Sequence, residues 1–99
     1  MYDMANVKKL KQMRELAPAA MDAFMAFDQA AFAEGALPVK VKELIAVAVA
    51  MTTQCPYCIE IHTKKATAAG ATLAEITEAT LVAAAIKAGG AVVHATHAI

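Results

Sequence analysis

Two cysteines and a histidine stand close together near the middle of this chain. Cys55 and Cys58 are separated by two residues, and His62 follows four residues after the second cysteine. On a helix that begins at Cys55, the three side chains share one face. The N–H groups and the dipole at a helix start favour a thiolate, and a histidine can accept a thiol proton. We therefore predict a redox dithiol site at Cys55 and Cys58, with His62 handling the proton.

Glu43 is the candidate third member of this site. It stands twelve residues before Cys55, near the start of a preceding apolar segment. Because that segment must pack against the cysteine helix across a short connection, the carboxylate could orient His62 or relay its proton. The simpler explanation is an ordinary first-turn glutamate that the helix dipole stabilises. The spacing alone favours the simpler explanation.

Three interpretations without redox chemistry remain open at this point. The same four side chains could bind zinc, although three of them lie on one predicted helix, whereas structural zinc sites usually combine two separated ligand pairs. A purely structural disulfide would close a very small loop, and the cytosol keeps such pairs reduced. A non-catalytic oligomeric binding module is the third alternative.

The elements that must position these residues are predicted to be helices. Alanine, the strongest helix former, supplies 26 of the 99 residues, and there is no tryptophan. We predict an all-α fold, a compact domain of about five or six helices, and a single domain over residues 1–99.

Capping residues and breakers predict the first three helix boundaries. Asn6 is a candidate N-cap for a first helix, and Pro18 starts the second. Gly35 is expected to end the second helix in the left-handed conformation. Pro38 opens a third helix that runs to about Thr53, which is apolar around nearly its whole circumference and is therefore expected to be buried.

The remaining boundaries follow from the same signals. The fourth helix begins at Cys55 and is closed by Gly70. Thr72 and Glu75 have the spacing of a capping box and start the fifth helix. The Gly-Gly pair at 89–90 is expected to stop or kink that helix, before a last short helix over residues 91–99.

The apolar content exceeds what a small domain can bury. Hydrophobic residues make up 60% of the chain and charged residues 18%. Large exposed apolar patches usually mark interfaces, so we predict a homo-oligomer. The apolar run Leu44–Met51 is far shorter than the ~20 residues that span a membrane, and the N-terminus does not resemble a signal peptide. We therefore expect a cytoplasmic protein without a membrane partner.

Charge excludes a nucleic-acid partner of the usual kind. Nine basic and nine acidic residues give a formal net charge of zero, whereas nucleic-acid-binding domains carry a basic patch or stripe. The short cluster of Lys8, Lys9 and Lys11 is interpreted as the solvated face of a helix.

The four candidate residues together resemble a known motif. Glu43, the Cys55–Cys58 pair and His62, at these spacings, are similar to the core motif of the alkylhydroperoxidase D-like proteins of the carboxymuconolactone decarboxylase superfamily. The resemblance extends from the approach at Pro38 through the helix break at Gly70 and the helix after it, about two thirds of the chain.

This resemblance implies an alkylhydroperoxidase D-like helical fold, trimers or hexamers, and a thiol-dependent oxidoreductase that reduces hydroperoxides without a metal or other cofactor. It implies that Cys58 is the peroxidatic thiol and that Cys55 is the resolving thiol. His62 and Glu43 are then the proton relay. The resemblance further implies a dithiol reductant, such as a lipoyl-bearing protein.

Tyr57 departs from the family pattern. The peroxidases of the family often have a second histidine immediately before the second cysteine, and a phenol, with an ordinary pKa of about 10, cannot replace it as a base near neutral pH. The family's true decarboxylases lack the cysteine pair, and their proton-transfer chemistry has no use for a dithiol. A γ-carboxymuconolactone decarboxylase-type activity is therefore the lesser alternative.

Overall fold

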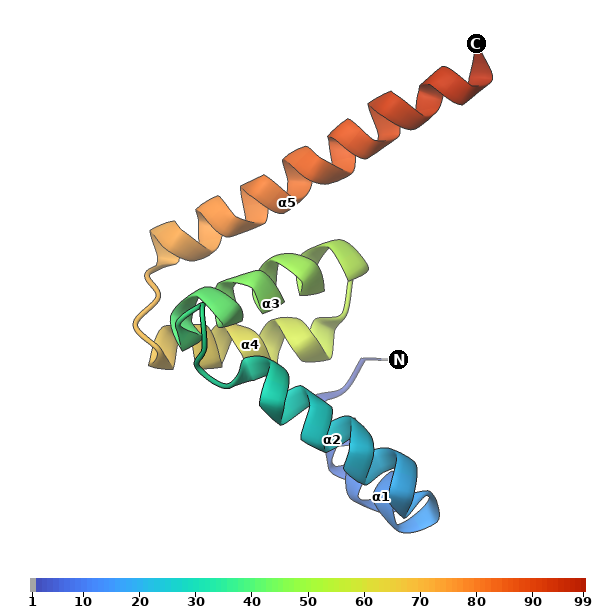
Figure 1. Cartoon of the computed structure of the whole chain (residues 1–99), viewed down its shortest axis with the longest axis vertical. Coiled ribbons are helices and arrows are strands. Elements are labelled where there is room, and N and C mark those ends of the chain that lie inside the picture. The colour runs from blue at the N-terminus through green and yellow to red at the C-terminus, as the bar shows by residue number, and fades with distance from the viewer. Residues whose placement is uncertain (1) are drawn as a thin grey trace.

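The protein, as a computed structural model, is described over residues 2–99 and is all-α, as predicted. α3 and α4 form a hairpin, α5 passes over α3, and α1 and α2 form a second hairpin that projects away from the first (Figure 1). The elements in chain order are η1 (Met4–Lys9), α1 (Leu10–Leu16), α2 (Pro18–Phe32), α3 (Val39–Thr53), α4 (Pro56–Ala68), α5 (Leu73–His94) and η2 (Ala95–Ala98), where η marks a 3-10 helix.

The tight connection between α3 and α4 brings the start of α4 beside the end of α3. Gln54 ends α3 in the left-handed conformation, with φ 58°. Cys55 then donates its N–H to the carbonyl of Ala50 at 3.1 Å and serves as the N-cap of α4. Pro56 occupies the first turn, where its missing N–H costs nothing. The dithiol segment therefore begins α4, as predicted.

A small core lies between α3, α4 and α5. Val47, Ala66, Ala71 and Ile76 are buried there, and Leu44 and Met51 pack against them. Gly70, with φ 97°, closes α4 and turns the chain toward α5. Thr72 and Glu75 form both hydrogen bonds of a capping box, so these two predicted boundaries are confirmed.

Two predicted caps are wrong. Asp3, not Asn6, is the N-cap of the first helical segment, and its side chain accepts from the Ala5 N–H at 2.9 Å. Gly35 does not end α2 in a left-handed conformation, because α2 already ends at Phe32 and Ala33 is extended, with φ −63° and ψ 146°. At the first cap, the Asp3 side chain supplies the hydrogen bond that the sequence pattern assigned to Asn6. At the end of α2, the Lys42 side chain donates to the carbonyls of Ala31 and Ala33.

The predicted break at Gly89 and Gly90 is also wrong. α5 continues through both glycines to His94, and the last segment is a single 3-10 turn instead of a separate helix over residues 91–99. A glycine weakens a helix interior by about 1 kcal/mol relative to alanine, but it does not forbid the helical conformation.

The single chain is open, contrary to the predicted compact domain. Its radius of gyration is 16.3 Å, compared with about 13 Å for a compact domain of 100 residues. Every residue from 84 onwards is exposed. The third helix is not buried all round either: Val47 is fully buried, but Ile45 and Val49 on its other face are 48% and 53% exposed. The core of one chain is therefore too small to cover its own helices.

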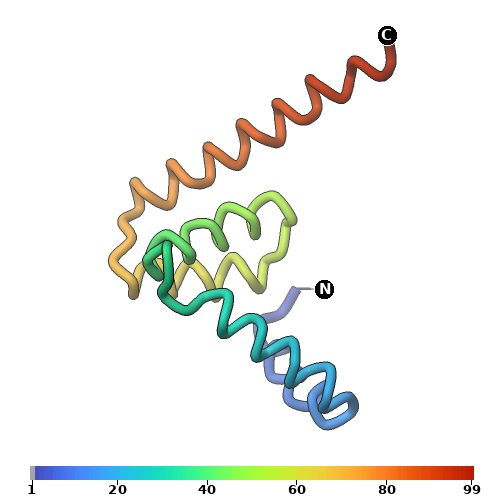
Figure 2. Tube along the Cα trace, viewed as in Figure 1, coloured from blue at the N-terminus to red at the C-terminus, as the bar shows by residue number. Residues whose placement is uncertain are grey.

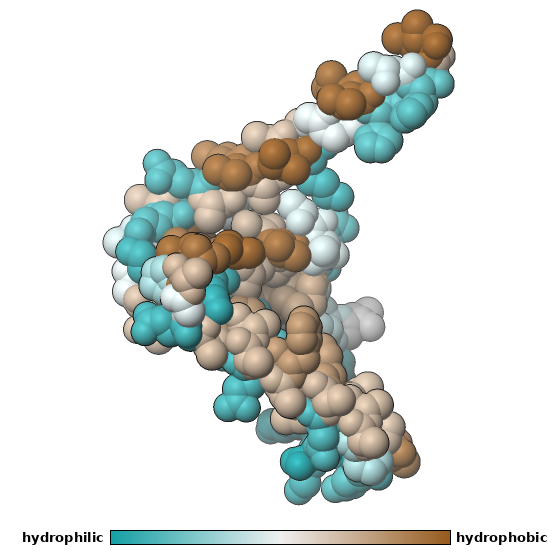
Figure 3. Space-filling model, viewed as in Figure 1, coloured by the Kyte–Doolittle hydropathy of each residue, from teal (hydrophilic) through white to brown (hydrophobic). Residues whose placement is uncertain are grey.

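The segment Leu73–Ala98, which comprises α5 and η2, is long and apolar enough to cross a membrane by length and composition alone. None of it is buried in the single chain, and apolar side chains gather along α5 and the neighbouring α3 on the face shown in Figure 3. This segment was not recognised from the sequence, because its alanine, valine, leucine and isoleucine residues are interrupted by threonine, glutamate, lysine, glycine and histidine.

Candidate dithiol site

Cys55 and Cys58 are free, half-buried thiols in the first turn of α4. The Cys58 N–H donates to the Cys55 Sγ at 3.3 Å, which makes the sulfur of Cys55 the side-chain cap of the helix. The predicted pair is thus brought together with one thiol placed to receive helix N–H groups.

The two thiols differ in acidity. The Cys58 thiol donates a hydrogen bond to the Cys55 sulfur, and this bond, with the Cys58 N–H, lowers the pKa of Cys55. The same bond, together with partial burial and the charge on Cys55, raises the pKa of Cys58 to about 11. When the reduced pair loses one proton, Cys55 is therefore the thiol that gives it up, and Cys58 retains its proton unless a base removes it.

The side chains of His62 and Glu43 are in hydrogen-bond contact. His62 Nδ1 lies 2.7 Å from Glu43 Oε2, and the two side chains are 16% and 5% exposed. Glu43 comes from α3 and His62 from α4, one turn beyond Cys58. Glu43 lies beyond the first turn of α3 and is buried against His62, so it is not the ordinary first-turn glutamate that the spacing alone favoured. With Nδ1 directed to the carboxylate, Nε2 is the ring nitrogen left to exchange a proton.

Phe32 and Lys42 also belong to the site, and sequence reasoning missed both. The Phe32 ring lies flat on the His62 ring, with centroids 4.9 Å apart and planes 11° apart. Lys42 donates to the carbonyl of Ala31 at 2.9 Å and to that of Ala33. The only sequence signal was that Lys42 directly precedes Glu43, while Phe32 was assigned to an apolar helix face.

Tyr57, between the two cysteines, is held by the N-terminal segment. Its hydroxyl accepts from Asn6 Nδ2 at 3.0 Å and from the Asp3 N–H at 3.5 Å, and its ring meets Tyr2 edge-on, with centroids 5.1 Å apart. Figure 2 shows that the N-terminal segment begins near the α3–α4 hairpin and leads away from it. Tyr57 is therefore a packing and hydrogen-bonding residue here.

The predicted residues do not converge as metal ligands. Within residues 2–99, no group of three or more His, Cys, Asp or Glu side chains is arranged to hold a metal ion. The Nδ1 atom of His62 faces Glu43, and the two thiols are hydrogen-bonded to each other. The zinc alternative therefore has no ligand set in this part of the chain.

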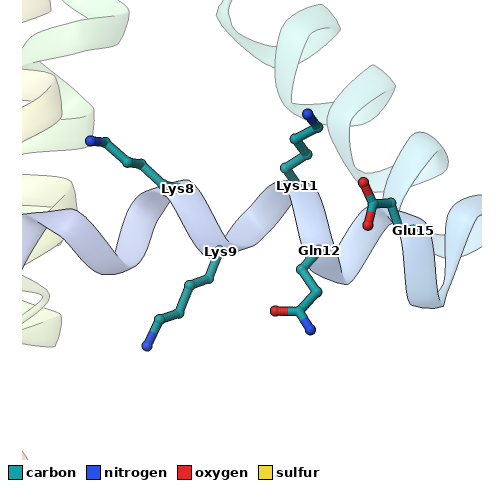
Figure 4. Close-up of a pocket in the computed structure, with 5 residues that line it drawn as sticks. All are labelled: Lys8, Lys9, Lys11, Gln12 and Glu15. Atoms are coloured by element: carbon teal, nitrogen blue, oxygen red, sulfur yellow. The ribbon is translucent and has the colours of Figure 1, made fainter.

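A shallow hollow on η1 and α1 is separate from this chemistry. Its lining side chains spread outward from the helix in several directions (Figure 4). They are exposed, as predicted for the solvated basic face, and they include neither a cysteine nor a histidine: Lys8, Lys9, Lys11, Gln12 and Glu15.

The fold and the site together define an all-helical domain with a dithiol at the start of one helix and a Glu–His pair beside it. The sequence profile of the carboxymuconolactone decarboxylase family matches residues 18–99. The chain belongs to this family, which includes decarboxylases and alkylhydroperoxidase D-like peroxidases.

Known relatives support this assignment. The chain is 54% identical over 78 residues to "Uncharacterized protein 4 in cox locus" of Paracoccus denitrificans, covering 79% of this chain and 70% of that protein. It is 46% identical over 61 residues to an uncharacterized protein of Cupriavidus necator, covering 62% of this chain and 54% of that protein. The second relative is thus matched over only about half of its length.

Two crystal structures share the fold. A protein from Methanobacterium thermoautotrophicum has a TM-score of 0.82 at 36% identity, over 88% of this chain and 98% of that one. A carboxymuconolactone decarboxylase family protein from Legionella pneumophila has a TM-score of 0.77 at 36% identity, over 91% of this chain and 80% of that one.

Proposed function

We propose that this protein is a thiol-dependent oxidoreductase that reduces hydroperoxides through Cys55 and Cys58. The observation that carries the proposal is the pairing of His62 with the buried Glu43 one helical turn after a dithiol of unequal acidity. A dithiol serves redox chemistry, and the Glu–His pair supplies the base that the less acidic thiol requires.

In the first step His62 takes the proton of Cys58, whose raised pKa otherwise keeps it protonated near neutral pH. The Cys58 thiolate attacks one oxygen of the hydroperoxide, the O–O bond breaks, and Cys58 becomes a sulfenic acid. The departing alkoxide takes a proton from His62 and leaves as the alcohol. Glu43 stabilises the imidazolium between these two proton transfers.

In the second step the Cys55 thiolate attacks the Cys58 sulfenic acid, which forms the disulfide and releases water after protonation. The lowered pKa of Cys55 suits this resolving role, because it makes the thiolate, the attacking form, more readily available. A dithiol reductant, such as a lipoyl-bearing protein, then transfers two electrons and two protons and restores both thiols.

The test follows hydroperoxide consumption with dihydrolipoamide and traps the sulfenic acid with dimedone in a single turnover. We expect wild type to turn over, Cys55→Ser to form a trapped sulfenic acid at Cys58, and Cys58→Ser to form none. A label at Cys55 in Cys58→Ser would reverse the two roles. No turnover by wild type with several dithiol reductants would overturn the proposal.

A decarboxylase activity is the alternative that the family leaves open. Proton-transfer chemistry needs His62 and Glu43 but not the thiols. The double variant Cys55→Ser/Cys58→Ser therefore separates the two functions: a decarboxylase would retain its activity on γ-carboxymuconolactone, and the proposed peroxidase would lose all of its activity.

The proposal includes a homo-oligomer, a trimer or hexamer. An apolar groove of about 410 Å³ runs between α3 and α5 and is open in the single chain. Its walls combine exposed aliphatic side chains from both helices: Ile45, Val49, Val82 and Ile86. A helix of another copy suits this groove better than lipid does, because Lys87 is among the residues that line it and a charge in the hydrocarbon layer is costly. A cytoplasmic location is part of the same proposal, and recovery with the membrane fraction would contradict it.

A further inference from the structure

We propose that Phe32 and Lys42 are positioning residues that fix the ring of His62 for proton transfer. Phe32 is the last residue of α2, and its ring covers one face of the imidazole at a centroid distance of 4.9 Å and an interplanar angle of 11°. The role of both residues in catalysis rests on the proposed function, but their effect on the imidazole does not.

The Glu43 hydrogen bond alone does not define the ring's orientation. It holds one atom, Nδ1, at 2.7 Å from the carboxylate, and the ring could still turn about that contact. A flat aromatic surface against the imidazole removes this rotation, because turning the ring plane would drive its edge into Phe32. The two contacts together keep Nδ1 on Glu43 and hold Nε2 in one direction.

Lys42 keeps Phe32 in place. α2 ends without a left-handed glycine, so its last carbonyl groups need another partner. The Lys42 ammonium donates to the carbonyls of Ala31 and Ala33, on either side of Phe32, and its charge suits the negative end of the helix. Because Ala33 is already extended, this bond defines where α2 stops and hence where Phe32 lies.

Consecutive residues of α3 therefore do two related tasks. Lys42 reaches back to α2, and Glu43 reaches across to His62 on α4. One turn of α3 therefore positions both neighbours of the His62 ring: Glu43 contacts Nδ1 directly, and Lys42 holds the end of α2 that carries Phe32. Without Lys42, the end of α2 and its Phe32 lose their anchor to α3.

The test is 15N NMR of the histidine ring in the reduced protein without substrate, recorded over a pH series and compared at pH values where the ring nitrogen shifts show a neutral imidazole. We expect wild type to show one tautomer of His62, with the proton on Nδ1. Phe32→Leu should mix the two tautomers and broaden the signals, and Phe32→Tyr, which keeps the aromatic face, should restore the single tautomer. Phe27→Leu is the matched control, since Phe27 lies on the same helix and is 70% exposed.

Lys42 is tested in the same spectra. Lys42→Met, which keeps the length of the side chain without the charge, should resemble Phe32→Leu, and Lys42→Arg should resemble wild type. Lys9→Met, on the exposed basic face, is the control. Circular dichroism identifies any variant that has not folded, and the Phe32 pair decides the outcome if Lys42→Met is one of them.

Turnover measurements link the ring to catalysis. Phe32→Leu should lower kcat for hydroperoxide by roughly tenfold to a hundredfold, with KM little changed, and Phe32→Tyr should recover it. A single unchanged tautomer in Phe32→Leu would overturn the inference, whatever the activity. If wild type shows no peroxidase activity, the proposed function fails, and the NMR result still decides whether Phe32 and Lys42 hold the ring.

Discussion

At the scale of single residues, the division of acidity between the two cysteines explains why the site contains a histidine. A hydrogen bond from the Cys58 thiol to Cys55 lowers the pKa of Cys55 and raises that of Cys58. A thiol whose pKa is raised is a poor nucleophile near neutral pH unless a base is at hand. In the proposed mechanism that base is His62, whose ring is hydrogen-bonded to Glu43.

Alkylation of the reduced protein measures this difference directly. Because the thiolate is the reactive form, we expect iodoacetamide to modify Cys55 first, with a rate that rises below the ordinary thiol pKa of about 8.5. Cys58 should react slowly until the pH approaches 11. Peptide mapping by mass spectrometry at a series of pH values measures both rates.

The variant Cys58→Ala provides the control for that experiment. It removes the thiol that donates to Cys55, so the pKa of Cys55 should rise and its alkylation near neutral pH should slow. Equal rates at the two cysteines across the whole pH range would contradict the division of acidity.

His62→Ala tests the base. Without His62, Cys58 must ionise unaided, so peroxide turnover near neutral pH should fall by roughly 10² to 10⁴-fold. The remaining rate should increase with pH toward 11, the pKa of Cys58, instead of levelling off near neutrality. His94→Ala, at the exposed end of α5, should leave the pH profile as in wild type. A flat loss of activity at all pH values would argue against proton transfer by His62.

Apart from Glu43, which the resemblance to a family motif supported, the residues of the site that the sequence predicted are those with local spacing. Cys55, Cys58 and His62 lie on one helix, where intervals of three and four residues determine the shared face. Phe32 lies thirty residues before His62 in the chain, and only the tertiary fold brings their rings together. The hydrogen bond between Asn6 and Tyr57 was not predictable for the same reason. Asn6 resembles an N-cap in its local sequence, and nothing in that sequence indicates a distant partner.

At the scale of the elements, side-chain caps define most of the boundaries. The capping box at Thr72 was predictable because both of its partners lie within one turn, and Glu75 also binds Lys40 of α3 at 2.7 Å. The end of α2 was not predictable, because its cap comes from Lys42, nine residues beyond Ala33. The glycines within α5 were misinterpreted because their cost is smaller than the cost of ending a helix there.

Thr72→Ala tests the capping box. Loss of the hydroxyl leaves the Glu75 N–H without its acceptor, so we expect the free energy of unfolding to fall by about 1 kcal/mol. Urea denaturation followed by circular dichroism measures it. Thr77→Ala, an exposed position within α5, should be neutral or slightly stabilising, since alanine is the better helix former. Equal effects of the two changes would mean that the box contributes nothing.

At the scale of the whole molecule, the proposed homo-oligomer would account for both the open shape of the single chain and its apolar composition. The excess of hydrophobic residues predicted an interface, and α3 and α5 carry exposed apolar side chains, such as Ile45, Val82 and Ile86, that the proposed homo-oligomer would cover. What the sequence could not provide is the direction in which α5 leaves the core, because that depends on packing against α3 and on the turn at Gly70.

Ile86→Glu tests the proposed oligomer. Ile86 is 74% exposed in the single chain, so a charge there should not disturb the chain's own core, but it would be buried between copies. We expect sedimentation velocity to show a trimer or hexamer for wild type and smaller species for Ile86→Glu. Gln12→Glu, on the polar face of α1, should sediment as wild type does. A wild-type monomer would rule out the homo-oligomer.

The uninterrupted course of α5 through Gly89 and Gly90 has a thermodynamic consequence. Both glycines lie in open space in the single chain, and the turns beyond them touch nothing that could offset their low helix propensity. In the proposed homo-oligomer, helix formation at this end is coupled to association by mass action. Dilution alone should then unwind the last turns of α5 and lower the melting temperature, so that the stability of the oligomer depends on protein concentration.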